Sequence, residues 1–213
     1  MQSAQDSPKT ESRWQRAEVA ERYAGERFTG SHADRDLRLV CRLIERFDGS
    51  DTTRSVLDLP AGTGRLHAGL SALSSSLVGA DVSAAMLERS AYRQDGSALL
   101  ADARRLPFRD DSFDVVVSCR LLHHLNDEQV ALALAEFMRV SNRLVVASFW
   151  DTACLTETRK RLRLRERTDA RRAITRAQLA RLVAEAGGSV LGHASSFRFF
   201  SPQTFVALRS NAR

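Results

Sequence analysis

Seven short apolar runs, separated by helix-like or turn-rich segments, constrain the fold of this chain more than any other feature. The runs lie at residues 55–59, 76–80, 98–101, 113–118, 144–149, 189–193 and 205–208. Strands that alternate with helices indicate βαβ units and a parallel sheet. We therefore predict an α/β fold with a doubly wound, seven-stranded and mostly parallel sheet.

The residues before the first run are predicted to be helical after a polar start. Residues 1–12 show no periodicity, so we expect a disordered tail there. Apolar residues at helical 3/4 spacing then indicate two amphipathic helices between residues 13 and 48, with a break around 25–31. No second domain or internal repeat is evident, so we assign residues 13–213 to a single domain.

Two helices carry recognisable start signals. Asn126 and Gln129 have the spacing of a capping box, as do Thr175 and Gln178. The second helix is predicted to end at Gly187, because glycine commonly terminates a helix.

Composition limits the class of protein. A chain of 213 residues that is 43% apolar suits one globular domain. No apolar run reaches the length needed to cross a bilayer, and the first residues lack the apolar core of a signal peptide, so we expect a cytoplasmic protein. The three cysteines show no metal-ligand spacing; we predict free thiols and no metal site.

The segment from Val56 to Arg65, which reads VLDLPAGTGR, is the most informative for function. An apolar strand ends at Asp58 and passes into a Gly-x-Gly turn before a helix. Glycines let the backbone approach a ligand closely, and the helix start offers unpaired N–H groups. A plain strand-to-helix turn and a dinucleotide site are the alternatives.

A dinucleotide site fits this segment poorly. Its fingerprint requires a third glycine where this chain has His67. A carboxylate at Asp58 would repel pyrophosphate, whereas it suits a ligand that carries an ammonium or sulfonium group.

Two later strands end in the same way. The segment 78–83, VGADVS, ends at Asp81, and Ser83 can cap the helix that carries Met86. The segment 101–103, ADA, precedes Leu-Pro-Phe.

These segments resemble the class I S-adenosylmethionine-dependent methyltransferases, especially the small-molecule branch that includes the quinone-biosynthesis methyltransferases. The resemblance covers roughly residues 56–149 and implies a Rossmann-like fold with S-adenosylmethionine as cofactor. One departure is Pro60, which stands where the family usually has its first glycine. Proline has no backbone N–H, so it cannot donate to the cofactor.

The resemblance also implies roles for individual residues. Asp81 would accept hydrogen bonds from both ribose hydroxyls, Met86 would lie against adenine, and Asp102 would take the adenine amino group. The full predicted cofactor set is Asp58, Ala61, Gly62, Gly64, Asp81, Val82, Met86, Asp102, Ala103 and Tyr23. The simpler alternatives are core packing for Met86 and a solvated loop acid for Asp102.

The same family has an N-terminal helical lid, which here corresponds to residues 13–48. Tyr23 resembles a tyrosine of that lid, and a helix-packing aromatic is the alternative.

His123 and His124 follow the fourth strand and are the candidate general bases. An imidazole titrates near neutral pH, and the carboxyl ends of parallel strands form the ligand face of such a sheet. Local packing or capping is the alternative for each. Cys119 as a nucleophile is a less favoured reading.

A basic insertion at residues 150–175, which overlaps an arginine-rich segment at 159–176, departs most from the family. Three readings are open: a solvated charged helix, a site for an anionic acceptor or lipid headgroup, and a nucleic-acid contact. The chain has a net charge of +6, and arginine supplies almost all of its positive charges. Codon usage also explains this abundance of arginine.

The predicted function is S-adenosylmethionine-dependent methylation of a small-molecule acceptor, with an anionic acceptor as one candidate. Three alternatives remain: a nucleic-acid methyltransferase, a cofactor-binding partner or regulatory protein without catalysis, and a nucleotide-dependent oxidoreductase. No base-methyltransferase tetrapeptide or RNA-binding module supports the first of these.

Overall fold

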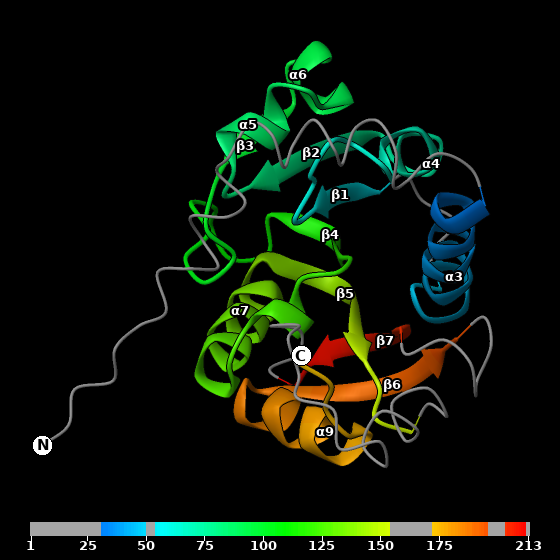
Figure 1. Ribbon diagram of the computed structural model, residues 1–213, viewed down its shortest axis with the longest axis vertical. Coiled ribbons are helices and arrows are strands. Elements are labelled where there is room, and N and C mark those ends of the chain that lie inside the picture. Colours follow the sequence, from blue (N-terminus) through cyan, green and yellow to red (C-terminus); the bar gives the residue numbers. More distant parts are fainter. Residues whose placement is uncertain (1–30, 50–53, 154–171, 196–202, 212–213) are drawn as a thin grey trace, which may run out of the picture.

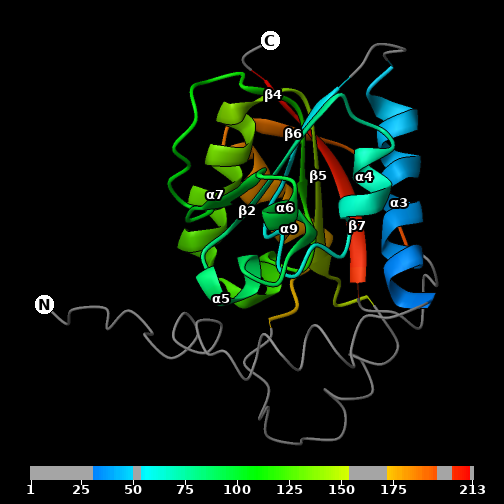
Figure 2. The same ribbon diagram turned by 90° about the horizontal axis from the view of Figure 1, so that it is seen from above.

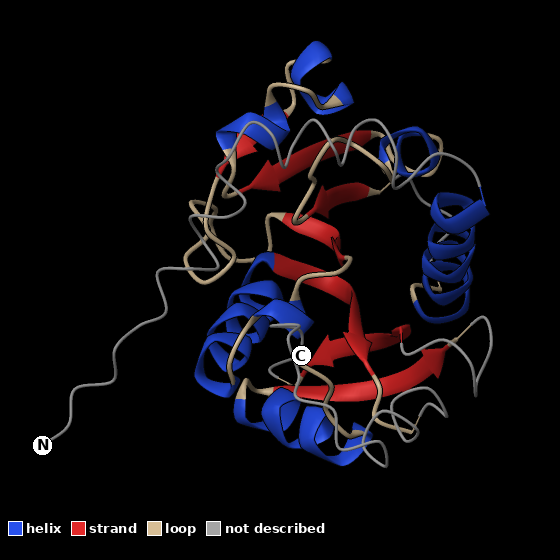
Figure 3. Ribbon diagram, viewed as in Figure 1, coloured by secondary structure: helices blue, strands red, loops and turns tan. Residues whose placement is uncertain are grey.

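The computed structural model describes residues 31–49, 54–153, 172–195 and 203–211. These residues form one seven-stranded sheet with helices on both faces (Figures 1 and 3). The strands are β1 (Ser55–Asp58), β2 (Ser76–Asp81), β3 (Ala98–Leu100), β4 (Phe113–Ser118), β5 (Ser141–Trp150), β6 (Gly188–Ala194) and β7 (Gln203–Ser210). The helices are α3 (Ser31–Phe47), α4 (His67–Ser71), α5 (Ala84–Leu87), α6 (Ala91–Gln94), α7 (Asp127–Val140), α9 (Arg176–Glu185) and the 3₁₀ turn η1 (Leu122–His124).

The strand order across the sheet is β3-β2-β1-β4-β5-β7-β6. Strands β1 to β5 pair in parallel, and β7 lies antiparallel between β5 and β6. The chain reverses its direction of travel across the sheet between β3 and β4, so β1 and β4 are neighbours at a topological switch point. Ligands bind such sheets at the carboxyl ends of the strands near this point. The predicted doubly wound, mostly parallel sheet is confirmed.

Burial on both faces explains why the central strands are almost wholly apolar. Val56, Val115 and Val117 pack with α3 and α4 on one face. Leu57 and Val116 point to the opposite face, where α7 and α9 cover the sheet. Figure 2 shows α3 and α4 on one side of the sheet and α7 on the other.

Both predicted capping boxes are present. The Asn126 side chain accepts from the Gln129 N–H at the start of α7, and Thr175 accepts from the Gln178 N–H at the start of α9. Each glutamine side chain returns a bond to the backbone N–H of its cap residue. Gly187, with φ +77°, follows α9 as predicted.

The helix α3 is part of the core. Its Val40, Leu43 and Ile44 are buried against the sheet. The predicted tail, the earlier part of the predicted lid with Tyr23, and most of the basic insertion lie outside the described residues. The lid and the insertion therefore stay predictions.

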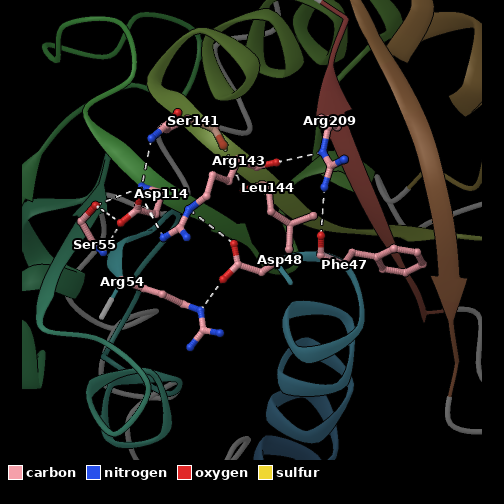
Figure 4. Close-up of polar contacts among 10 residues, drawn as sticks. Phe47, Asp48, Arg54, Ser55, Asp114, Ser141, Arg143, Leu144 and Arg209 are labelled. Carbon is pink, nitrogen blue, oxygen red and sulfur yellow. Dashed lines mark hydrogen bonds and ion pairs between the residues drawn. The ribbon is translucent and has the colours of Figure 1, made fainter. Parts of the chain in front are cut away.

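Charged residues join α3 to the amino ends of the strands (Figure 4). Asp48 accepts from Arg54, and Arg143 pairs with Asp114 at 3.0 Å. Asp114 also accepts from the Ser55 backbone N–H at 2.9 Å. These contacts fix the edge of the sheet opposite to the predicted ligand face, so we assign them a structural role.

Candidate functional site

The carboxyl ends of β1, β2 and β3 bring the predicted cofactor residues to one edge of the sheet. Asp58 ends β1 and Asp81 ends β2, and these two strands are direct neighbours. Asp102 follows β3, which pairs with β2. Parallel pairing therefore gathers three acids that are far apart in the sequence.

The glycine-rich loop after β1 is tied to β2 through its backbone. The Ala61 N–H donates to the Ala80 carbonyl oxygen at 2.8 Å, and the Gly62 N–H donates to Asp81 Oδ2 at 2.8 Å. The Ser83 N–H donates to the other oxygen, Asp81 Oδ1, at 2.9 Å. The two carboxylate oxygens of Asp81 thus hold two backbone segments, and each oxygen retains a second lone pair.

The two glycines of the loop serve different purposes. Gly62 has φ +55°, and a Cβ there would meet no atom of the described residues within 4 Å. Gly64 has φ +84°, and a Cβ there would lie 2.9 Å from the Ala91 backbone nitrogen and from Ser90 Oγ. Among the described residues, Gly62 therefore borders open space, whereas Gly64 allows the loop to approach the start of α6.

Asp58 is fully buried and is held on one side only. The Tyr92 hydroxyl donates to its Oδ2 at 2.7 Å. Its Oδ1 is buried and has no hydrogen-bond partner among the described residues. Burial raises the pKa of Asp58 to about 7, although the Tyr92 hydrogen bond and the positive charge of Arg65 oppose that rise.

Asp81 and Asp102 differ in their electrostatic environment. Burial raises the pKa of Asp81, while its backbone N–H bonds lower it. Asp102 is half-buried; burial raises its pKa, but the Arg104 guanidinium and backbone N–H outweigh that effect and hold the pKa below its usual range. The Arg104 Nη2 lies 2.7 Å from Asp102 Oδ2. A ligand that uses Asp102 must therefore share it with Arg104.

The remaining predicted cofactor residues lie around the same edge. Ala61 and Ala103 are buried, and so is Met86 in α5. Val82 is exposed, which leaves its side chain accessible beside Asp81. The cofactor roles of these residues stay predictions.

A family model described as "Methyltransferase domain" matches residues 57–143. The matched segment begins inside β1, contains the glycine-rich loop with Asp58, Asp81 and Asp102, and ends in β5. Residues 57–143 therefore carry the methyltransferase-domain pattern. The resemblance noted from the three acidic strand ends is thereby confirmed.

Known methyltransferases match the same part of the chain. A methyltransferase named GfsG from Streptomyces halstedii is 37% identical over 119 residues, which is 52% of this chain and 42% of that protein. A demethylmenaquinone methyltransferase from Clavibacter sepedonicus is 37% identical over 99 residues, which is 44% of this chain and 40% of the relative. The match thus spans less than half of the length of either relative.

Solved structures share the fold of the methyltransferase domain. A magnesium protoporphyrin IX methyltransferase from Synechocystis PCC 6803, solved with bound SAH, has a TM-score of 0.76 at 15% identity. The alignment covers 96% of this chain and 100% of that one. An S-adenosylmethionine-dependent methyltransferase from Clostridium acetobutylicum has a TM-score of 0.70 at 12% identity, covering 91% and 98% of the two chains. At these identities the likeness concerns the fold.

The two candidate bases of the methyltransferase domain have different surroundings. His123 in η1 is buried, and its ring stacks on Trp150 with centroids 4.9 Å apart and an interplanar angle of 19°. The His124 ring lies 4.1 Å from that of His123 and is half-buried. His124 is therefore the more accessible of the two.

A polar cluster beside the glycine-rich loop after β1 was not predicted. Asp36 of α3 is buried, and its Oδ2 accepts from Arg65 Nη1 at 2.8 Å and from Arg120 Nη2 at 3.0 Å. Arg65 Nη2 also lies 3.0 Å from Cys119 Sγ. Burial raises the pKa of the Cys119 thiol to about 11, against the charges of the two arginines. The thiol is neutral at physiological pH, which argues against Cys119 as a nucleophile.

Sequence signals for this cluster were weak. Asp36 lies on the same face of α3 as the buried Leu39, Val40 and Leu43, and nothing in the sequence connects it to Arg120. Arg120 has φ +66°, which is uncommon for a residue other than glycine. Its backbone N–H donates to Ser148 Oγ at 2.7 Å, which fixes that conformation.

Membrane-spanning helices and groups of metal ligands are both absent from the described residues. No helix among them is long and apolar enough to span a membrane. Within the same part of the chain, no group of three or more histidine, cysteine or acidic side chains is placed to hold a metal ion.

Proposed function

We propose that this protein transfers a methyl group from S-adenosylmethionine to a small-molecule acceptor. The observation that carries the proposal is the buried Asp58, one oxygen of which has no partner among the described residues, beside Gly62, where a Cβ would meet no described atom within 4 Å. An unpaired buried carboxylate oxygen is costly unless a ligand satisfies it. An ammonium group is the chemical partner that such an oxygen favours.

The residues at this edge suit the proposed cofactor. Asp58 Oδ1 would accept from the α-ammonium group, and the spare lone pairs of Asp81 would accept from the ribose hydroxyls. Val82 offers an exposed apolar surface for the adenine ring. When bound, S-adenosylmethionine supplies a sulfonium methyl group for in-line displacement by a nucleophile.

The protein's own contribution is alignment and, where the acceptor needs it, proton removal. We propose His124 as the candidate base, because His123 is buried against Trp150 and acts in packing. The strand order supports this placement, since η1 follows β4 and β4 is the neighbour of β1.

An anionic acceptor is supported by the charges around Asp36. Two guanidinium groups, those of Arg65 and Arg120, share one carboxylate oxygen, so the group of three carries a net positive charge. Arg120 is partly exposed and follows β4 at the ligand edge. Guanidinium groups bind carboxylates and phosphates in bidentate fashion.

The known relatives are compatible with a small-molecule acceptor. The names of two of them mention demethylmenaquinone and magnesium protoporphyrin IX. The described part of the arginine-rich segment pairs with acids of this chain: Arg172 with Asp127 and Arg176 with Asp151.

Transfer of a radiolabelled methyl group tests the proposal. The protein and labelled S-adenosylmethionine are incubated with small-molecule extracts that have been separated by charge, and with total RNA. We expect label in an acidic small-molecule fraction and much less of it with an Asp81→Asn variant at the same cofactor concentration. Label in RNA would overturn the acceptor class. Binding of the cofactor without label in any fraction would favour a non-catalytic role.

Arg120→Gln then tests the anionic acceptor. We expect a KM for the acceptor at least about tenfold higher than that of wild type. The affinity for S-adenosylhomocysteine should be unchanged. Arg120→Lys should restore part of the loss. An unchanged KM for Arg120→Gln would contradict the assignment.

A further inference from the structure

The contacts around Asp58 carry an inference about Tyr92, a residue outside the three acidic motifs. Tyr92 lies in α6, is completely buried, and its hydroxyl makes a side-chain contact with the first acid of the site. The inference rests on the proposed function, because it concerns how Asp58 is presented to the cofactor.

Two glycines make the approach of Tyr92 possible. A Cβ on Gly79 of β2 would lie 2.3 Å from Tyr92 Cγ, so only glycine leaves room for the ring beneath the strand. A Cβ on Gly64 would collide with Ser90 and Ala91 at the start of α6. Both close contacts press α6 against the loop and the sheet. The tyrosine hydroxyl is thereby fixed at the end of β1.

The hydrogen bond from Tyr92 gives the two oxygens of the Asp58 carboxylate different roles. Oδ2 is occupied by Tyr92 at 2.7 Å, while Oδ1 is buried and without a partner in the described part of the chain. A hydroxyl has one proton to donate, and the burial of Tyr92 raises its own pKa far above its ordinary value. Tyr92 is therefore a permanent donor, and it favours the ionised form of Asp58.

We propose that Tyr92 is a positioning residue of the cofactor site: its hydroxyl holds Oδ2 and favours ionised Asp58, so that Oδ1 meets the ligand's ammonium group as a carboxylate. Cofactor affinity is then linked to the ionisation of Asp58. A protonated Asp58 offers the ammonium group no charge, so binding weakens as the pH falls.

Neighbouring charges set the pH range of this linkage. Arg65, at the end of the loop, lowers the pKa of Asp58, and Asp81 raises it. Burial is the largest influence, and the resulting value of about 7 places the change between about pH 6 and pH 8. His67 lies edge-on to the Tyr92 ring at 4.7 Å and pairs with Asp95 at 2.6 Å, so it belongs to the same surroundings.

The test is the affinity of the full chain for S-adenosylhomocysteine, measured by calorimetry from pH 5.5 to pH 8.5. This product carries the same α-ammonium group and is chemically stable. We expect the wild-type affinity to rise with pH by up to tenfold per pH unit below the midpoint, and to level off above it. Tyr92→Phe keeps the buried ring but should move the midpoint upward by about one to two pH units.

Three controls define the outcome. Asp58→Asn should bind weakly and without this pH dependence. His67→Gln, which removes a nearby imidazole, should keep the wild-type midpoint. The ¹³C signal of the Asp58 carboxyl group in the ligand-free protein should titrate near pH 7 in wild type and higher in Tyr92→Phe.

Two results would overturn the inference while leaving the proposed function standing. One is wild-type binding that does not change with pH. The other is a Tyr92→Phe variant with a uniformly weaker affinity and the wild-type midpoint, which would mean that Tyr92 acts only in packing. Absence of binding by wild type at every pH would overturn both proposals together.

Discussion

The backbone N–H of Gly62 donates to Asp81 Oδ2 at 2.8 Å, so the loop after β1 is held by the acid that ends β2. Asp81, the predicted acceptor of hydrogen bonds from the ribose hydroxyls, is thus also an anchor of the glycine-rich loop. A change at Asp81 affects two parts of the site at once. This coupling explains why the two acidic strand ends belong to one functional unit.

Alanine substitutions at the two loop glycines should differ in their cost. Both glycines have positive φ, for which a Cβ costs about 1–2 kcal/mol. Only Gly64→Ala also collides with Ser90 and Ala91, which adds about 1–3 kcal/mol. Chemical denaturation should therefore show a clearly larger loss of the free energy of unfolding for Gly64→Ala than for Gly62→Ala. Equal losses would contradict the assigned contact between the loop and α6.

The free energy of unfolding of Asp58→Asn, relative to that of wild type, should increase as the pH rises. The pKa of Asp58 is about 7 in the folded protein, against an ordinary value of 3.8 for an aspartate. Its contribution to stability is fully present below pH 3.8 and is lost as the pH rises through 7. The loss is of the order of 4 kcal/mol at most. Urea denaturation at pH 5 and pH 8 measures the difference between variant and wild type, and a difference that is independent of pH would refute the raised pKa.

His123→Gln and His124→Gln should separate packing from catalysis. The first removes a buried ring stacked on Trp150 and should lower the free energy of unfolding by about 1–3 kcal/mol. The second should leave stability nearly unchanged and reduce kcat by about 10²–10⁴-fold at saturating acceptor. Unchanged turnover by His124→Gln would exclude it as the base.

Cys119 should resist alkylation in the folded protein. Its thiol is buried, and a pKa of about 11 leaves only about 0.1% thiolate at pH 8. Treatment with iodoacetamide at pH 8, followed by peptide mass analysis, should find Cys119 unmodified in native protein and modified in urea. Cys119→Ala should also keep its methyl-transfer activity. Rapid modification of native protein would show that the thiol is accessible and ionised.

The sequence predicted the strands well because the central ones, β1, β4, β5 and β7, are buried apolar runs, and most of the runs end at an acid or a turn. The ends of β1 and β2 were accurate for this reason. The capping boxes at Asn126 and Thr175 were equally legible, since they depend on residues three positions apart. The position of β7 between β5 and β6 was not predicted, because the order of strands is decided by packing across the whole sheet.

The surroundings of the site residues were much less predictable. Nothing local connects Tyr92 to Asp58, which lies 34 positions earlier. Asp36 meets Arg120 across 84 positions, and only the folded sheet brings them together. Asp102 could be recognised as an acid after a strand, but its pairing with Arg104 depends on side-chain geometry. The motifs therefore indicated which residues lie together at the site. Their hydrogen-bond partners and the shifts of their pKa values depend on the fold.

The most direct test of the cofactor site is calorimetric titration with S-adenosylmethionine and S-adenosylhomocysteine, with NAD as the control ligand. Wild type and Asp81→Ala should be compared at pH 8, where Asp58 is ionised. We predict micromolar binding of both sulfur compounds by wild type, no binding of NAD, and a loss of at least about tenfold in affinity for Asp81→Ala. Absence of binding by folded wild type, or equal binding by the variant, would contradict the assignment of this edge of the sheet as the cofactor site.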